Sequence, residues 1–249
     1  MNSCAIILAG GEGKRMKSDK PKTLSPVLGK PMLTWVVSAL HKAGIDDICI
    51  VKGYKKECID EYIDETGLKA ESVYQAERLG TGHAVMMAKD FLRSRGGNVV
   101  ILNGDAPFMS AQTIADSLEQ HKSTGSAATV ISARVDDPAG YGRIVRAEDG
   151  SLRAIVEHKD ADPETLKINE VNSGGYWFDS ELLLSVLDRI KSENAAGEYY
   201  LPDAVKLLLD DGKTVGAFTA ENSDAVLGAN DPAQLEELNQ IARAKGYSC

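Results

Sequence analysis

The residues with the clearest chemistry lie near the start of the chain. An apolar run, Ala5–Leu8, leads into the glycines of Gly10–Gly13, and the basic side chains of Arg15 and Lys22 follow in the same segment. Glycines let backbone N–H groups approach a ligand closely, and successive N–H groups form a concave site for an anion. Basic side chains beside such a site can contact several phosphate oxygens at once. The segment predicts a loop that binds nucleotide phosphates; the simpler alternative is a strand-to-loop turn with solvated basic residues.

Two familiar glycine-rich loops match this segment poorly. A P-loop ends in Gly-Lys-Ser/Thr, but Gly13 and Lys14 are followed by Arg15, which excludes that motif. A dinucleotide-binding loop runs directly into a helix, whereas this chain soon reaches Pro21. The hypothesis of a nicotinamide-dependent dehydrogenase is therefore supported only by a weak glycine pattern, and a failure of the protein to bind NAD would exclude that hypothesis.

Acidic and amide side chains farther along the chain could complete such a site. Asp105 follows an apolar run, and Mg²⁺ usually takes one or two carboxylates together with phosphate oxygens of the substrate. Alone, Asp105 would better be interpreted as a turn residue before Pro107, but a phosphate loop at the same sheet edge favours a magnesium site. Glu157 and Asn172 occupy expected strands, where they could hydrogen-bond sugar hydroxyls or simply face solvent.

No side chain stands out as a general base, and this absence is informative. A phosphate monoester has a second pKa near ~6, so it is already mostly dianionic at neutral pH. Its attack on a nucleotide phosphorus would need no proton removal. It would need charge neutralisation and in-line positioning, which a metal ion, an arginine and a lysine can supply.

The elements that position these residues alternate between strands and helices. We expect strands at 4–8, 47–51, 71–75 and 98–102, and helices at 31–42, 55–65, 83–92 and 110–123. Continuous apolar strands of this kind are typical of a parallel sheet that is covered on both faces. Ligands of such sheets bind beyond the carboxyl ends of the strands. The segments Gly10–Lys22, Gln75–Thr81 and Asn103–Asp105 follow three of these strands, so we expect them to share one cleft.

The second half of the chain has a different pattern. Strand-like segments at 128–134, 140–145, 155–158 and 171–178, with a hairpin signal at Asp149-Gly150, predict an antiparallel addition over the cleft. Helices are expected at 180–190, 202–210 and 231–245, and a last core strand at 214–218. The predicted fold is α/β, with a Rossmann-like, mostly parallel sheet, helices on both faces and a small antiparallel sugar-binding addition. We expect a domain at 1–228 and a C-terminal helical segment at 229–249.

Composition excludes several other classes of protein. The chain has 249 residues and a net charge of −9, which argues against a nucleic-acid partner. No apolar stretch approaches the length of a membrane span, so no membrane partner is expected. The four cysteines show no C-x-x-C spacing, and Cys4 and Cys49 lie in apolar runs. This usage predicts small buried side chains in a reduced, cytoplasmic protein.

These motifs together resemble a known family. Eight sequence motifs occur in the order typical of the family and span nearly the whole chain: LAGGEGKRMKSDKPKTL, QAERLGTGHA, NGDAPF, GYGRI, VEHKDA, EVNSGGY, GEYYLPDAV and GAND. The chain resembles the sugar nucleotidyltransferases. Among them it is most similar to the pyrophosphorylase domain at the N-terminus of bifunctional bacterial N-acetylglucosamine-1-phosphate uridylyltransferases.

The resemblance implies a reaction and a set of roles. The reaction would join UTP and N-acetylglucosamine 1-phosphate, with Mg²⁺, to give UDP-N-acetylglucosamine and pyrophosphate. The catalytic side chains would be Arg15, facing the leaving pyrophosphate, and Lys22. Nucleotide contacts would come from Leu8, Ala9, Gly10, Gly11, Lys22, Gln75, Gly80, Thr81, Asn103 and Gly104, with Gln75, Gly80 and Thr81 reading uracil. Sugar contacts would come from Gly142, Glu157, Asn172 and Asn230, and the magnesium contacts would be Asp105 and Asn230.

The chain also departs from the family pattern. Gly10 replaces a usual Ala, Asn103 a common Tyr, and Ser173 and Pro202 each a usual Thr. No left-handed β-helix domain is expected within residues 229–249. A uridylyltransferase for glucose, galactose or N-acetylgalactosamine 1-phosphate stays an alternative, as does a non-catalytic module that binds UDP-sugars. We expect a monomer or a weak homo-oligomer.

Overall fold

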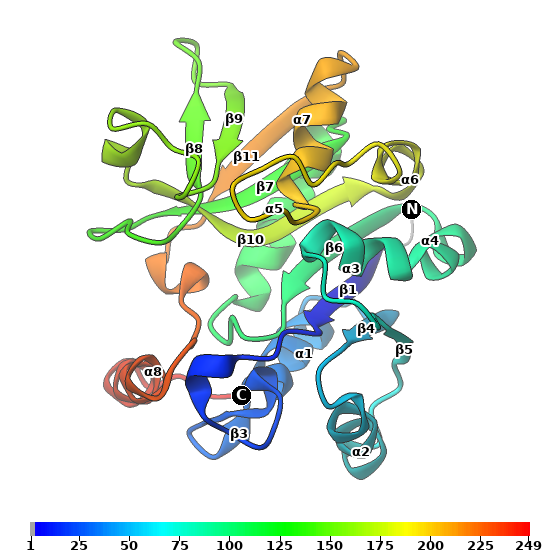
Figure 1. The fold of residues 1–249 in the computed structure, drawn as a ribbon, viewed down its shortest axis with the longest axis vertical. Helices are drawn as coiled ribbons and strands as arrows, with labels where there is room; N and C mark the ends of the chain where they lie inside the picture. Colours follow the sequence, from blue (N-terminus) through cyan, green and yellow to red (C-terminus); the bar gives the residue numbers. More distant parts are fainter. Residues whose placement is uncertain (1–2) are drawn as a thin grey trace.

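The computed structural model describes residues 3–249, and a single large sheet runs through them (Figure 1). Within these residues nine strands form this sheet, in the order β11-β7-β10-β6-β1-β4-β5, with β8 beside β10 and β9 beside β8. A separate two-stranded ribbon, β2–β3, precedes the first long helix. The bounds are β1 Ser3–Ala9, β2 Pro26–Val27, β3 Lys30–Pro31, β4 Ile48–Lys52, β5 Glu71–Tyr74, β6 Asn98–Asn103, β7 Ala128–Arg134, β8 Arg143–Arg146, β9 Leu152–Val156, β10 Glu170–Asp179 and β11 Val215–Thr219.

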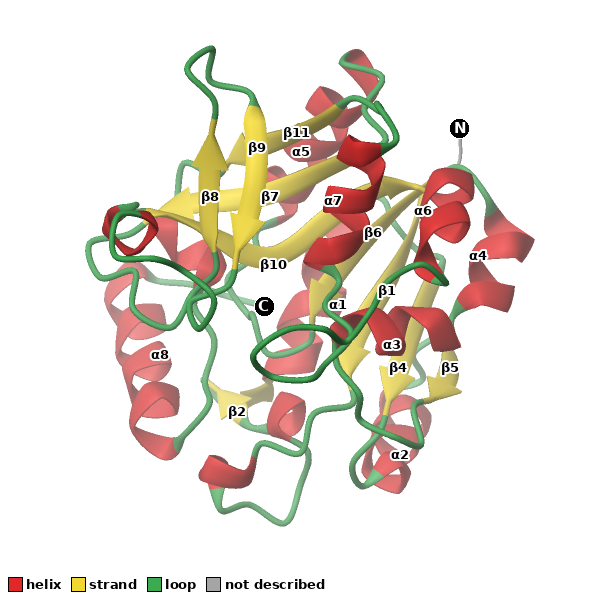
Figure 2. Ribbon diagram, turned by 45° about the horizontal axis from the view of Figure 1, so that its top comes forward, coloured by secondary structure: helices red, strands yellow, loops and turns green. Residues whose placement is uncertain are grey.

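Helices cover both faces of the sheet, as the continuous apolar strands predict (Figure 2). On one face lie α1 (Met32–Lys42), α2 (Lys56–Thr66) and α5 (Ala111–Ser123). On the other lie α3 (Thr81–Met87), α4 (Lys89–Arg95), α6 (Ser180–Leu187) and α7 (Pro202–Asp210). The last helix, α8 (Pro232–Lys245), packs against β2. The predicted α/β class is therefore confirmed, while the division of the chain at residue 228 stays a prediction.

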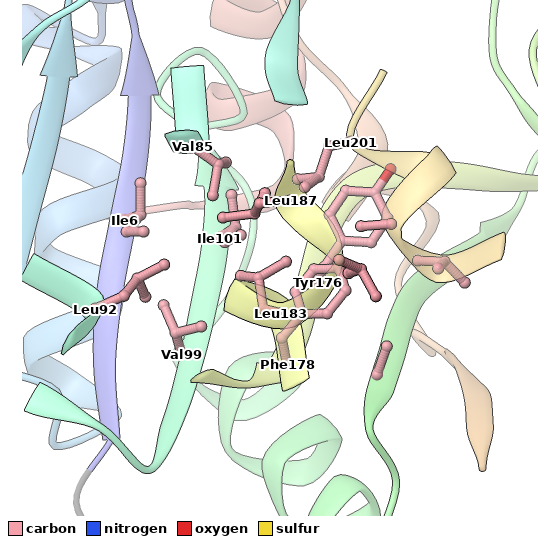
Figure 3. Close-up of a cluster of buried hydrophobic side chains, with 14 of the residues drawn as sticks. Ile6, Val85, Leu92, Val99, Ile101, Tyr176, Phe178, Leu183, Leu187 and Leu201 are labelled. Carbon is pink, nitrogen blue, oxygen red and sulfur yellow. The ribbon is translucent and has the colours of Figure 1, made fainter. Parts of the chain in front are cut away.

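Successive residues of the central strands enter opposite cores. Ile6 of β1 packs on the α3/α4/α6 side, as Figure 3 shows, whereas Ile7 packs on the α1 side, and both are fully buried. Cys4 and Cys49 lie in the core on the α3/α4/α6 side of the sheet, buried as their apolar surroundings predict. Burial raises the pKa of both thiols to about 12, so they remain protonated.

One predicted helix is two helices in the structure. The pattern over 83–92 predicts one element, but the chain leaves helical geometry at Ala88 (φ −94°, ψ 14°), between α3 and α4. The amide of Ala88 bonds to Val85 O, three residues back, which tightens the turn there. Each helix still buries an apolar side toward the sheet, Val85 from α3 and Leu92 from α4, so the apolar pattern itself is explained.

The position of β10 also differs from the prediction. We expected 171–178 in the antiparallel addition, but β10 lies inside the main sheet, antiparallel to both β6 and β7. Tyr176, Trp177 and Phe178 are all buried, because this part of the strand is covered on both faces. The first part of β10 is interrupted by a bulge between Asn172 and Gly175 and carries the β8–β9 hairpin. The addition is therefore an extension of the main sheet.

No helix within residues 3–249 has both the length and the apolar character that crossing a membrane requires.

Candidate active site

Two adjoining cavities lie at the carboxyl ends of the strands. One, of about 330 Å³, contains residues from all three of the segments that we expected to share a cleft. Its lining includes Leu8, Gly10, Gly11, Lys22, Gln75, Gly80, Thr81, Asn103 and Asp105. The other, of about 530 Å³, extends toward the β8–β9 hairpin, and its lining includes Arg15, Tyr141, Gly142, Glu157, Asn172 and Asn230. Leu8, Lys22, Thr81, Asn103, Asp105 and Glu198 line both, so the cavities meet at these residues.

Lys22 joins two distant acceptors at this meeting point. It begins a short 3₁₀ turn after Pro21, and its ammonium forms an ion pair with the Asp105 carboxylate. The same ammonium donates a hydrogen bond to Asn230 Oδ1 at 2.9 Å. The side chains of Lys22 and Asp105 are each 17% exposed, so the pair is largely shielded from water. The carboxylate of the β6 end and the amide oxygen just before α8 thus converge on one positive charge.

This convergence fits a magnesium ion. Among the described residues, no group of three or more His, Cys, Asp or Glu side chains is placed to hold a metal. Mg²⁺ does not need such a group, because it keeps waters and takes phosphate oxygens alongside one or two protein ligands. Asp105 and Asn230 offer two hard oxygen donors at a point where a cation already sits. Spacing alone could not identify Asn230, which only the resemblance pointed to.

The floor of the smaller cavity is built around Gln75. Its side chain is 4% exposed, and its Nε2 lies 3.0 Å from Gly80 O and 3.1 Å from His83 Nδ1. Gly80 has φ 108°, and a Cβ there would lie 2.7 Å from Tyr199 O, so only glycine fits. The close turn at Gly80 therefore brings its carbonyl to Gln75.

The remaining predicted nucleotide residues occupy different depths. Arg15 lies in a 3₁₀ turn that begins after Gly13, where φ is 61°, and its exposed side chain lines the larger cavity. Ala9 and Gly104 are buried and line neither cavity. The amide of Gly104 instead donates to Leu8 O at 3.0 Å, which ties the end of β6 to the end of β1.

The far end of the larger cavity carries amide and acidic groups. Asn172 donates to the Tyr176 hydroxyl at 2.6 Å and accepts from the Gly174 amide at 2.9 Å, so its side chain is fixed. Its backbone amide donates to Gly142 O at 2.9 Å. Gly142 also lies against Glu157, whose Oε1 would be 3.0 Å from a Cβ at that position. The structure therefore groups these three predicted residues.

The electrostatics of this end oppose the charge on Glu157. Burial raises the pKa of the Glu157 carboxyl, and the charges of Asp160 and Asp203 raise it further. A buried carboxylate whose charged form is disfavoured in this way gains from hydrogen-bond donors, such as the hydroxyl groups of a ligand in the cavity.

Sequence reasoning missed several residues of the cleft. Tyr141, Glu198 and Tyr200 line the larger cavity, and their only sequence signals are the GYGRI and GEYYLPDAV motifs that contain them. Glu12 and Arg78, which both line the smaller cavity, form an ion pair at 3.1 Å that joins the glycine loop to the segment after β5. Nothing in their spacing predicts that pair.

Comparisons with known proteins agree with this architecture. A family model described as nucleotidyl transferase matches residues 4–228. The bifunctional protein GlmU of Acetivibrio thermocellus is 44% identical over 241 residues, covering 97% of this chain and 52% of that protein. GlmU of Clostridium tetani is 44% identical over 250 residues, covering 98% of this chain and 53% of that protein. The chain thus spans about half the length of the curated relatives it matches.

A solved structure shows the same fold over its full length. It is a Bacillus anthracis protein, assigned as a glucose-1-phosphate thymidylyltransferase, in complex with sucrose. The TM-score is 0.79 at 25% sequence identity, and the match covers 99% of this chain and 98% of the other.

Proposed function

The chain belongs to the nucleotidyl transferase family, and from this premise we propose that it transfers a uridylyl group from UTP to N-acetylglucosamine 1-phosphate. The products are UDP-N-acetylglucosamine and pyrophosphate. The observation that carries the proposal is the position of Lys22, Asp105 and Asn230 at the point where the two cavities meet. One cavity suits a nucleotide and the other a sugar, so their meeting point is where two anionic reactants would come together.

The chemistry follows from charge and position. An oxygen of the sugar phosphate forms a bond to the α-phosphorus of UTP, while the bond from that phosphorus to the β-phosphate oxygen breaks. The attacking phosphate is already mostly dianionic at neutral pH, because its second pKa is near ~6, so no side chain has to take a proton. Lys22 neutralises charge at the α-phosphate, and Arg15, on the rim of the same cleft, binds the departing pyrophosphate.

Asp105 and Asn230 are the residues that would hold Mg²⁺, which when bound withdraws charge from the phosphate oxygens that it contacts. Lys22 then exchanges its two protein acceptors for a phosphate oxygen. Before the substrates bind, the Lys22 ammonium keeps these two oxygen donors together.

The sugar end is read by groups that are already fixed. The Asn172 amide is held by Tyr176 and Gly174, and Glu157 offers an acceptor to sugar hydroxyls. Small changes in such a pocket alter selectivity by only ~1–3 kcal/mol. Glucose, galactose or N-acetylgalactosamine 1-phosphate therefore remain candidate substrates beside N-acetylglucosamine 1-phosphate.

A substrate panel tests the proposal. UTP and Mg²⁺ are incubated with each of these four sugar 1-phosphates, and pyrophosphate release is measured. We expect turnover that requires Mg²⁺ and is greatest with N-acetylglucosamine 1-phosphate. Tight binding of UDP-N-acetylglucosamine by calorimetry, without turnover of any sugar phosphate, would instead favour a non-catalytic binding module.

A further inference from the structure

The orientation of the Gln75 amide is fixed by chemistry, although amide nitrogen and oxygen atoms look alike in most structures. The Gly80 carbonyl can only accept a hydrogen bond, so the atom 3.0 Å from it must be the amide nitrogen. His83 Nδ1 lies 3.1 Å from the same nitrogen. An amide nitrogen can only donate, so His83 Nδ1 is the acceptor in this contact and the ring proton is on Nε2. Both protons of the amide are then used.

The amide oxygen is consequently left for a ligand. Within residues 3–249, the side-chain hydrogen bonds of Gln75 both use Nε2, and none is formed by Oε1. This oxygen lies over the glycine loop, 2.9 Å from the position that a Cβ on Gly10 would take. Gln75 lines the smaller cavity and is 4% exposed, so a partner for Oε1 must come from within that cavity. Toward the cavity, the side chain is an acceptor only.

We propose that His83 is a positioning residue for base selection: by accepting from Gln75 Nε2 it holds Oε1 toward the base as an acceptor. The inference rests on the proposed uridylyl transfer. The uracil edge has a single N–H donor, at N3, so Oε1 can pair only with that group. Cytosine has a lone pair at N3 instead of an N–H group. Two acceptors, cytosine N3 and Gln75 Oε1, would then face each other, and no hydrogen bond could form between them. The pocket therefore accepts a uracil base and rejects cytosine.

The surroundings of His83 keep its ring in place. His83 lies in the first turn of α3, directly after Gly80, and its ring centroid is 6.2 Å from that of Tyr199. The Tyr199 backbone accepts from the Gly82 amide at 2.7 Å, which anchors the same turn. Without an acceptor at Nδ1, only Gly80 would hold the Gln75 amide. The amide could then rotate and offer Nε2 to the lone pair of cytosine.

Equilibrium binding separates this role from a structural one. Dissociation constants for UDP and CDP are measured by calorimetry on the full chain with wild-type protein, with His83→Leu and with His83→Asn. We expect His83→Leu to reduce the preference for UDP over CDP by about tenfold or more, since a buried group is left without its partner. His83→Asn should restore the preference, because its amide oxygen can replace Nδ1 as the acceptor. His83→Ala replaces the leucine variant if circular dichroism shows that the latter does not fold.

Each result has a definite meaning. A merely structural role would weaken UDP and CDP equally, so an unchanged ratio in the leucine or alanine variant would overturn the inference. In that case UDP binding by the wild-type protein would leave the proposed function standing. If the wild-type protein bound neither nucleotide, the proposed function would fail, and this inference with it.

Discussion

Replacing Lys22 with methionine should change metal binding and turnover in opposite directions. In the structure the Lys22 ammonium is bound to the Asp105 carboxylate and to Asn230 Oδ1. A magnesium ion that uses these two oxygens must first displace the ammonium. Methionine keeps most of the side-chain length and removes the charge. Lys22→Met should therefore bind Mg²⁺ more tightly than the wild type when no nucleotide is present, while its turnover should be far lower.

The size of both effects follows from the geometry. Exposed ion pairs contribute about 0–1 kcal/mol, but these side chains are only 17% exposed. A hydrogen bond to a charged group then contributes about 1.5–3 kcal/mol, which corresponds to roughly a 10- to 150-fold gain in Mg²⁺ affinity. Turnover should fall by ~10²–10³, the usual loss when a donor to transition-state charge is removed.

Calorimetric titration of nucleotide-free protein with MgCl₂ gives the first quantity, and pyrophosphate release gives the second. Lys20→Met is the matched control, because Lys20 lies two residues away in the same loop and is exposed. The control should leave both quantities close to those of the wild type. An unchanged Mg²⁺ affinity in Lys22→Met would refute the idea that this lysine holds the metal oxygens.

Glu157→Gln should weaken binding of the sugar 1-phosphate, yet raise the free energy of unfolding at neutral pH, because burial and nearby acids raise the pKa of Glu157. A raised carboxyl pKa means that the folded state binds the proton more tightly. The stability gain should therefore shrink as the pH falls through that pKa, in urea titrations at several pH values. Glu170→Ala should lower the free energy of unfolding by about 3–5 kcal/mol, because Arg146 loses both of its bonds to this buried carboxylate. A free energy of unfolding in urea within about 1 kcal/mol of the wild-type value would contradict this expectation for Glu170→Ala. Ser110→Ala should cost about 0.5–2 kcal/mol by the same assay, since the Ser110 side chain caps α5 through the Thr113 amide.

Much of the framework could be predicted from local patterns. Apolar runs that are buried on both faces mark β1, β4 and β6, and the helix expected at 110–123 is confirmed as α5, whose first turn is capped by the Ser110 side chain. The position of the cleft follows from the same framework, because the ends of parallel strands meet at one edge. For this reason the sequence alone predicts that residues as far apart as Gly10 and Asn103 lie in one cleft, and both line the smaller cavity.

The remaining features depend on contacts that leave no local trace. Lys22 and Asn230 are 208 residues apart, and neither spacing nor periodicity can pair them. The break at Ala88 is invisible because alanine is the strongest helix former. The apolar run of β10 has the same appearance whether its neighbours are parallel or antiparallel. Its place between β6 and β7 depends on how the side chains pack in the cores on both faces of the sheet.

The bulge in β10 limits how the wall of the cleft can evolve. Between Asn172 and Gly175 this strand advances three residues while β7 advances one. The surplus is an even number, so the alternation of sides survives the irregularity. Deleting a single residue there would turn Trp177 and its neighbours to the wrong side and disrupt both cores. Losing or gaining residues in pairs would keep the interior intact, so natural length variants at this point should differ by multiples of two.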